Sequence, residues 1–219
     1  MSQITLVRHG QAQTHARDEA TYDALSPLGT QQSQWLGAHL IGTGTVFSSC
    51  HVGTLTRHAQ TLDAMGNGWA AGAVADARLN ELEYFTLSRL FEVQHDAPVP
   101  ADREGFVHHL PAMFTAWAEG RIDGAPETFE AFETRVRAAL DDIVALGHPA
   151  LIVTSGGVIG MAMRLSLGLD LQAMSQMCLS IANTSVHGMF PLGGRLTPTL
   201  FNALPHLDTP DRRHALTHL

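Results

Sequence analysis

The fold of this chain is decided by the sequence ITLVRHG at residues 4–10. Residues 4–7 are apolar or β-branched, and Arg8, His9 and Gly10 follow them directly. A short run of this kind, without alternating polar residues, is typical of a strand that is buried on both faces of a parallel sheet. The abrupt change to charged residues and a glycine predicts that the strand ends here in a turn.

Two other stretches predict strands of the same sheet. Residues 151–154, LIVT, are followed by Ser155, Gly156 and Gly157, which repeats the pattern of an apolar strand that ends in a turn leading to a helix. Residues 46–49, VFSS, give a weaker signal of the same type. We therefore expect three parallel strands from well-separated parts of the chain.

Helical patterns lie between these stretches. Ser26 before Pro27 is typical of a helix N-terminus. A later segment has apolar residues at the spacing of an amphipathic helix, namely Phe129, Phe132, Val136, Leu140 and Ile143. The alternation of strands and helices predicts an α/β fold in three layers, with a mostly parallel sheet covered by helices on both faces.

Two segments depart from this alternation. Residues 184–190 and 196–201, on either side of the glycine pair 193–194, predict a hairpin at the edge of the sheet. Residues 84–127 show no clear strand pattern, and we interpret them as a mainly helical insertion. We expect one domain over residues 1–219.

The composition excludes several classes of function. The chain has 13 basic and 21 acidic side chains and a net charge of -8, which argues against a dedicated nucleic-acid partner. All the basic residues are arginines, so chemistry that requires a lysine is excluded. No Asp, His or Cys cluster with metal-ligand spacing occurs, and we expect neither a metal nor another cofactor.

The sequence also predicts the surroundings of the protein. No stretch approaches the ~20 apolar residues of a membrane span, and the N-terminus lacks the features of a signal peptide. We expect a cytoplasmic protein without a membrane partner. Cys50 and Cys178 are far apart, which favours two buried thiols over one disulfide. The oligomeric state stays open, with a homodimer as one option.

Charged residues follow the predicted strands at the point where ligands bind in open α/β sheets. Arg8 and His9 come after the first strand, and Arg57 lies beyond the stretch 46–49. Arginine binds phosphate oxygens in a planar, bidentate manner and keeps its charge. A histidine between two guanidinium groups should have a lowered pKa, and a neutral imidazole is a nucleophile. These residues predict an anion site with a nucleophile.

The sequence LVRHG at residues 6–10 resembles the signature of the histidine phosphatase superfamily, whose fold is that of the phosphoglycerate mutases. Other segments match this family in its own order: residues 25–32, 47–49 with 57–61, 79–81, 183–186 and 201–207. The resemblance covers essentially the whole chain. It implies a metal-independent phosphomonoester hydrolase, whose partner is a small phosphorylated substrate or a phosphate ion.

The resemblance also implies a role for each matching residue. His9 would take the phosphoryl group as a phosphohistidine, while Arg8 and Arg57 would bind its oxygens. Glu81 would protonate the leaving oxygen and then activate water, with Glu83 as the less favoured alternative. The true mutase reaction is a weaker option, because the insertion contains few basic residues for a second anionic group.

At one position the sequence departs from the family pattern. Most members have His-Gly where this chain has Ser155 and Gly156, so it is similar to a branch with serine in place of the second catalytic histidine. We expect Ser155 and Gly156 to bind phosphate. Loss of a charge-assisted contact predicts roughly 10- to 100-fold lower activity. The alternative is a catalytically idle phospho-ligand-binding or regulatory protein.

Five further side chains have open roles. His15 could supply a cation near the phosphate, although a solvated loop histidine is the favoured interpretation, and His58 is interpreted as structural. The substrate is not identified. Tyr84, Phe85 and Phe91 fit an apolar leaving group and core packing equally well.

Overall fold

A six-stranded sheet, in the order β3-β2-β4-β1-β5-β6, organises the computed structural model, which describes residues 3–100 and 102–218. The strands are β1 Ile4–Arg8, β2 Ser49–Val52, β3 Val74–Ala75, β4 Ala150–Thr154, β5 Val186–Leu192 and β6 Arg195–Ala203. Strands β1 to β4 pair in parallel, whereas β5 and β6 are antiparallel. The predicted mostly parallel sheet is confirmed.

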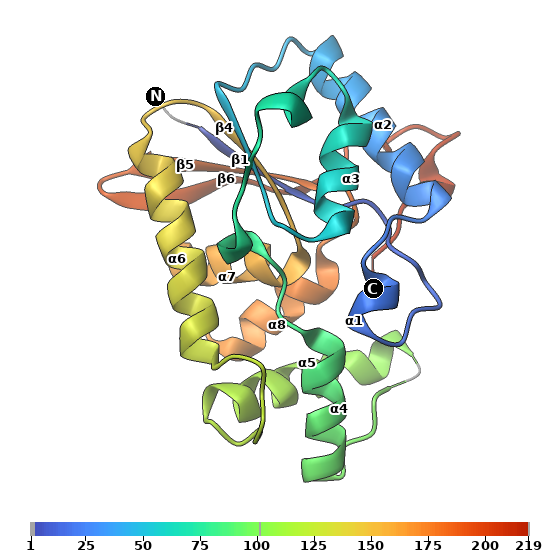
Figure 1. Cartoon of the computed structure of the whole chain (residues 1–219), viewed down its shortest axis with the longest axis vertical. Helices are drawn as coiled ribbons and strands as arrows, with labels where there is room; N and C mark the ends of the chain where they lie inside the picture. The colour runs from blue at the N-terminus through green and yellow to red at the C-terminus, as the bar shows by residue number, and fades with distance from the viewer. Residues whose placement is uncertain (1–2, 101, 219) are drawn as a thin grey trace.

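The helices connect these strands and cover the sheet (Figure 1). They are α1 Glu19–Tyr22, α2 Pro27–Gly42, α3 Thr56–Met65, α4 Tyr84–His95, α5 Arg103–Ala118, α6 Phe129–Ala145, α7 Gly156–Leu167 and α8 Leu171–Ser180. Short 3-10 turns occupy Trp69–Gly72, Ala77–Leu79 and Arg213–Ala215. Helix α2 begins at the predicted Pro27, where the Ser26 hydroxyl accepts a hydrogen bond from the Gly29 N–H.

The central strands β1 and β4 are buried on both faces, as their unbroken apolar runs require. Leu6 and Ile152 pack into one apolar cluster with residues of α4 to α8. Val7 and Val153 point the other way, into a second cluster with residues of α2 and α3. Because successive side chains of a strand face opposite sides, this division makes the three predicted layers.

The third predicted strand is displaced. The sequence predicts a strand at residues 46–49, but the observed strand β2 begins at Ser49. Its residues Cys50 and Val52 pair with β4. Val46 is 76% exposed, whereas Cys50 and Val52 are 6% exposed. The polar His51 interrupts the apolar pattern of the real strand, and this concealed it in the sequence.

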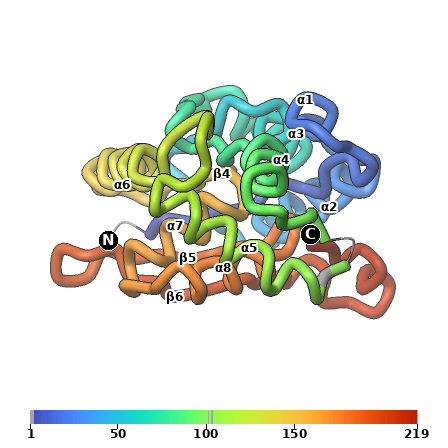
Figure 2. Tube along the Cα trace, turned by 90° about the horizontal axis from the view of Figure 1, so that it is seen from below, coloured from blue at the N-terminus to red at the C-terminus, as the bar shows by residue number. Residues whose placement is uncertain are grey.

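The predicted hairpin and the two buried thiols are also present in the structure. Gly193 and Gly194 have positive φ angles of 55° and 78°, which a two-residue hairpin turn between β5 and β6 requires. Both cysteines are free and buried. Helices α4 and α5 lie side by side at one end of the molecule, as both views show (Figure 1, Figure 2). Within residues 3–100 and 102–218, no helix combines the length and apolarity that a membrane span requires.

Candidate active site

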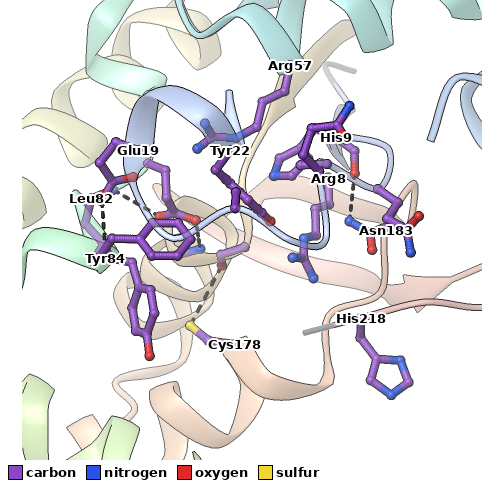
Figure 3. A pocket seen from close by; sticks show the side chains of 18 of the residues that line it. Arg8, His9, Glu19, Tyr22, Arg57, Leu82, Tyr84, Cys178, Asn183 and His218 are labelled. Carbon is purple, nitrogen blue, oxygen red and sulfur yellow. Dashed lines mark hydrogen bonds between the residues drawn. The ribbon is translucent and has the colours of Figure 1, made fainter. Parts of the chain in front are cut away.

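A cavity of about 350 Å³ lies where β1 and β4 end. Arg8, His9, Arg57, Glu81 and Gly156 all line it. These residues come from the end of β1, the first turn of α3, the loop before α4 and the start of α7. The structure thus brings together the predicted site residues of four separate segments (Figure 3).

His9 is held by backbone contacts on both sides. Its N–H donates to the Thr154 carbonyl at 2.9 Å, and the next N–H, of Gly10, donates to the Thr61 hydroxyl at 3.0 Å. Gly10 must be a glycine, because a Cβ atom there would lie 2.4 Å from the Gly29 carbonyl oxygen. The close approach of these two backbones fixes the turn that presents the imidazole.

The tautomer of His9 follows from its hydrogen bond. Its Nδ1 lies 2.7 Å from the Gly10 carbonyl oxygen, which can only accept. Nδ1 is therefore assigned the proton, and Nε2 keeps its lone pair. Burial, then the charges of Arg57 and Arg8, hold the pKa of His9 well below its usual value. The imidazole is neutral at physiological pH, as the sequence predicts, although burial is a larger cause than the predicted charge repulsion.

Arg8 and Arg57 are buried cations with unused donors. One Nη of Arg8 donates to the Ile181 carbonyl at 2.5 Å, and one Nη of Arg57 donates to Asp23 at 3.1 Å. The Nε atoms of both arginines are buried and have no hydrogen-bond partner among the residues that the structure describes. Both arginines line the cavity with their positive charge, so an anion bound there would stabilise this arrangement.

Asp23 is a site residue that the sequence analysis missed. Its carboxylate accepts hydrogen bonds from the backbone N–H groups of Thr56 and Arg57 at 2.9 and 3.2 Å, in addition to the guanidinium. It therefore caps α3 from another segment and fixes Arg57 at the same time. The Tyr22 ring lies 5.1 Å from the Arg57 guanidinium and 6.2 Å from the His9 ring. No motif marks either residue, because their partners are distant in sequence.

The Glu81 carboxylate is fixed at the edge of the cavity. It accepts from the Gly157 N–H at 2.9 Å and from the Leu82 N–H at 3.1 Å. A Cβ atom at Gly157 would lie 2.2 Å from a Glu81 carboxylate oxygen, so the glycine makes room for the acid. The alternative acid, Glu83, is exposed and is not among the described residues that line the cavity.

Ser155 and His58 form a buried pair behind the cavity wall. The Ser155 hydroxyl lies 2.6 Å from Nε2 of His58, and the His58 and His9 rings are 5.6 Å apart. The ring of His58 fits because Gly53 has no side chain: a Cβ atom there would lie 2.2 Å from its Nδ1. Both residues are fully buried. Burial first, and then the charge of Arg57, hold the pKa of His58 well below its usual value.

The structure also places the remaining polar side chains that could bind a ligand. His15 is exposed, and its neighbours Thr14 and Ala16 line the cavity in its place. Asn183 lines the cavity and donates from its side chain to the His9 carbonyl at 3.3 Å. In the part of the chain that the structure describes, no group of three or more His, Cys, Asp or Glu side chains could hold a metal ion.

Comparison with known proteins identifies the family of this chain. The model of the histidine phosphatase superfamily (branch 1) matches residues 4–203. The Probable phosphoglycerate mutase GpmB of Enterobacter sp. (strain 638) is 30% identical over 194 residues, which are 85% of this chain and 83% of that protein.

Solved structures share the fold at lower identity. Phosphoserine phosphatase of Entamoeba histolytica, in complex with 3-phosphoglyceric acid, superposes with a TM-score of 0.70 at 16% identity, over 94% of this chain and 100% of that one. Alpha-ribazole phosphatase of Shigella flexneri gives 0.66 at 18% identity, over 92% and 96%. The fold and the family match define an enzyme of the phosphatase and mutase class. The chain belongs to the histidine phosphatase superfamily.

Proposed function

We propose that the protein is a metal-independent phosphomonoester hydrolase that acts on a small phosphorylated compound through a phosphohistidine intermediate. One observation carries the proposal: a neutral His9, with the lone pair of Nε2 free, shares a cavity with the guanidinium groups of Arg8 and Arg57. The two arginines supply the positive charge that a metal ion supplies in other phosphoryl-transfer sites.

In the first step, Nε2 of His9 attacks the phosphorus and forms a P–N bond while the bond to the leaving oxygen breaks. Arg8 and Arg57 bind the phosphoryl oxygens and stabilise their charge in the transition state. Glu81, protonated at this stage, gives its proton to the leaving oxygen. The organic product departs as an alcohol.

In the second step, the Glu81 carboxylate takes a proton from a water molecule, and the water oxygen attacks the phosphorus. The P–N bond breaks, its electron pair returns to Nε2 of His9, and inorganic phosphate leaves. Glu81 is then protonated again for the next turnover. Its contact with the Gly157 N–H keeps the carboxylate beside the phosphoryl position in both steps.

Gly156 completes the proposed phosphate site, whereas the predicted phosphate ligand Ser155 pairs with His58 and is not among the described lining residues. Gly156 lines the cavity at the start of α7, where backbone N–H groups and the helix dipole favour an anion. We assign the chain to a branch with serine in place of the second histidine. A serine hydroxyl brings no charge, so we expect roughly 10- to 100-fold lower activity than a second imidazolium would allow.

Trapping the intermediate tests this function. We expect the protein to incorporate radiolabelled phosphate from 4-nitrophenyl phosphate into an acid-labile, EDTA-resistant phosphoenzyme. His9→Ala should abolish labelling and lower turnover by on the order of 10⁴-fold or more. The matched control is His15→Ala, which removes an exposed imidazole outside the cavity and should label normally. Turnover without His9 would exclude the mechanism.

A second candidate is a catalytically idle phospho-ligand-binding or regulatory protein. The pairing of the Ser155 hydroxyl with His58, away from the cavity, is the observation in its favour. The fixed Glu81 carboxylate speaks against it, because a binder does not require an acid at that place. Phosphate binding by calorimetry, without any phosphoenzyme over a panel of phosphomonoesters, would select this candidate.

A further inference from the structure

The cavity has a second wall of a different character. Five residues of α4 and α5 form this apolar wall: Tyr84, Phe85, Phe106, Leu110 and Phe114. Phe91, which the sequence groups with Tyr84 and Phe85, belongs to the buried core and is not among the described lining residues. Leu110 and Phe114 belong to the same core cluster and also line the cavity, so the apolar wall is a part of the core that is open to a ligand.

The apolar wall is continuous with the site of phosphoryl transfer. The Tyr22 ring lies 6.2 Å from the His9 ring and 5.5 Å from the Phe85 ring. The Phe85 ring in turn lies 5.8 Å from that of Tyr84. In the close-up, Tyr84 stands across the cavity from His9 (Figure 3). A group attached to the phosphoryl oxygen would therefore meet aromatic rings.

The charges of the cavity do not favour a second anionic group. Among the described lining residues, Arg8 and Arg57 are the only arginines, and both flank His9, where one phosphoryl group would use their charge; the one other histidine in that lining is His218. The carboxylate of Glu19 also lines the cavity and accepts from the Phe85 N–H at 2.8 Å. Burial raises the pKa of Glu19, which shows that negative charge is already unfavourable there.

From this arrangement we infer that the substrate is a phosphomonoester of an uncharged, largely apolar alcohol, with an alkyl or aryl group against the apolar wall. The inference rests on the proposed function for the phosphoryl step. The two arginines bind the phosphoryl group, and the organic part displaces water from Phe85, Phe106 and Leu110. The carboxylate of a compound such as phosphoserine or 3-phosphoglycerate would find no further arginine among the described lining residues, because Arg8 and Arg57 already bind the phosphoryl group.

Binding tests the inference without turnover. Calorimetry with the whole protein should show hexylphosphonate binding about 30-fold or more tighter than methylphosphonate, because each buried methylene adds affinity. 2-Carboxyethylphosphonate should bind no tighter than methylphosphonate. Equal affinities of the alkylphosphonates, or tighter binding of the carboxylate compound, would overturn the inference.

Turnover separates this inference from the proposed function. Alkyl phosphates from ethyl to hexyl have similar leaving groups, so a roughly threefold rise in kcat/KM per methylene would report contact with the apolar wall. His9-dependent hydrolysis that favours phosphoserine over hexyl phosphate would overturn the inference and leave the proposed function intact. Tighter hexylphosphonate binding without phosphoenzyme from any ester would support the ligand class while the proposed function fails.

A variant pair gives a directional test. Phe106→Arg adds a cation to the apolar wall at a half-buried position, and should raise kcat/KM for 3-phosphoglycerate relative to hexyl phosphate by about 10-fold. Val107→Arg adds the same charge at the next position, which is 40% exposed and not among the described lining residues, and should leave the ratio unchanged. Equal ratios in both variants would place Phe106 outside the substrate site.

Discussion

The two walls of the cavity are built in different ways. At the charged end, Arg8, His9 and Arg57 are 5%, 2% and 2% exposed, and hydrogen bonds tie each to another segment or to the backbone. The apolar wall stands on α4 and α5, beyond the sheet, and several of its rings are half-buried (Figure 1). Groups for chemistry are fixed by the sheet, whereas the surface for the organic group is carried by helices outside it.

The difference follows from the forces involved. Phosphoryl transfer requires charges and a lone pair to be placed accurately, because catalysis falls steeply with small displacements. Apolar contact is non-directional and depends on area. Side chains of the apolar wall can therefore be substituted without displacing the groups at the charged end. Variants of the two walls should therefore alter different steps of the proposed reaction.

After His9→Ala, the largest effect is expected at Glu81. Glu81→Gln removes the proposed proton donor while it keeps the shape of the side chain, and should lower kcat for alkyl phosphates by about 10²- to 10⁴-fold. The loss should be smaller with 4-nitrophenyl phosphate, whose leaving oxygen needs no proton. Glu83→Gln is the matched control at an exposed position and should keep full activity. Equal losses in the two variants would reassign the acid.

The next largest effect on activity is expected from the buried pair Ser155 and His58, behind the charged end of the cavity. Ser155→His alone should destabilise the protein, because the new imidazole would meet His58, whose Nε2 is 2.6 Å from the serine hydroxyl. Ser155→His combined with His58→Ala opens that space and should form the phosphoenzyme roughly 10-fold faster than the wild type. Rapid-quench labelling measures this rate. A folded double variant no faster than His58→Ala would place position 155 outside the phosphate site.

A smaller effect is expected from a substitution in the apolar wall, and it distinguishes the roles of the two walls. Phe85→Ala removes a ring in contact with Tyr22 and should lower kcat/KM for hexyl phosphate by roughly 10-fold. The rate of phosphoenzyme hydrolysis should not change, because the organic group has already left. Single-turnover experiments resolve the two steps. A variant that slows both steps equally would show that the walls are not independent.

The last prediction concerns stability at acidic pH, where the smallest effect is expected. Burial lowers the pKa of His187 to about 3 from the ordinary 6.5, and also holds that of His9 low. Between these pH values the unfolded chain binds protons that the folded protein does not, so the free energy of unfolding falls as the pH falls. We expect Tm to decrease from pH 7 to pH 4. His187→Gln should reduce this dependence, and the exposed His15→Gln should leave it unchanged.

Much of the fold and part of the candidate site could be predicted from the sequence. Strands β1 and β4 are recognisable in the sequence because a strand buried on both faces requires an unbroken apolar run. These runs end at Arg8 and Ser155. Helix α6 shows its buried side through apolar spacing, and the hairpin shows its turn through two glycines. Strand β2 was misplaced because it contains a polar residue, His51, within a buried segment.

The sequence by itself determined the layered sheet and which residues gather where its strands end, since these depend on local patterns of polarity. Only the tertiary structure decided how that site is completed. Asp23 reaches Arg57, and His58 reaches Ser155, across 34 and 97 positions of the chain. The apolar wall likewise exists only where α4 and α5 meet the strand ends. Contacts between distant residues arise from the folded path of the backbone, and no local pattern encodes them.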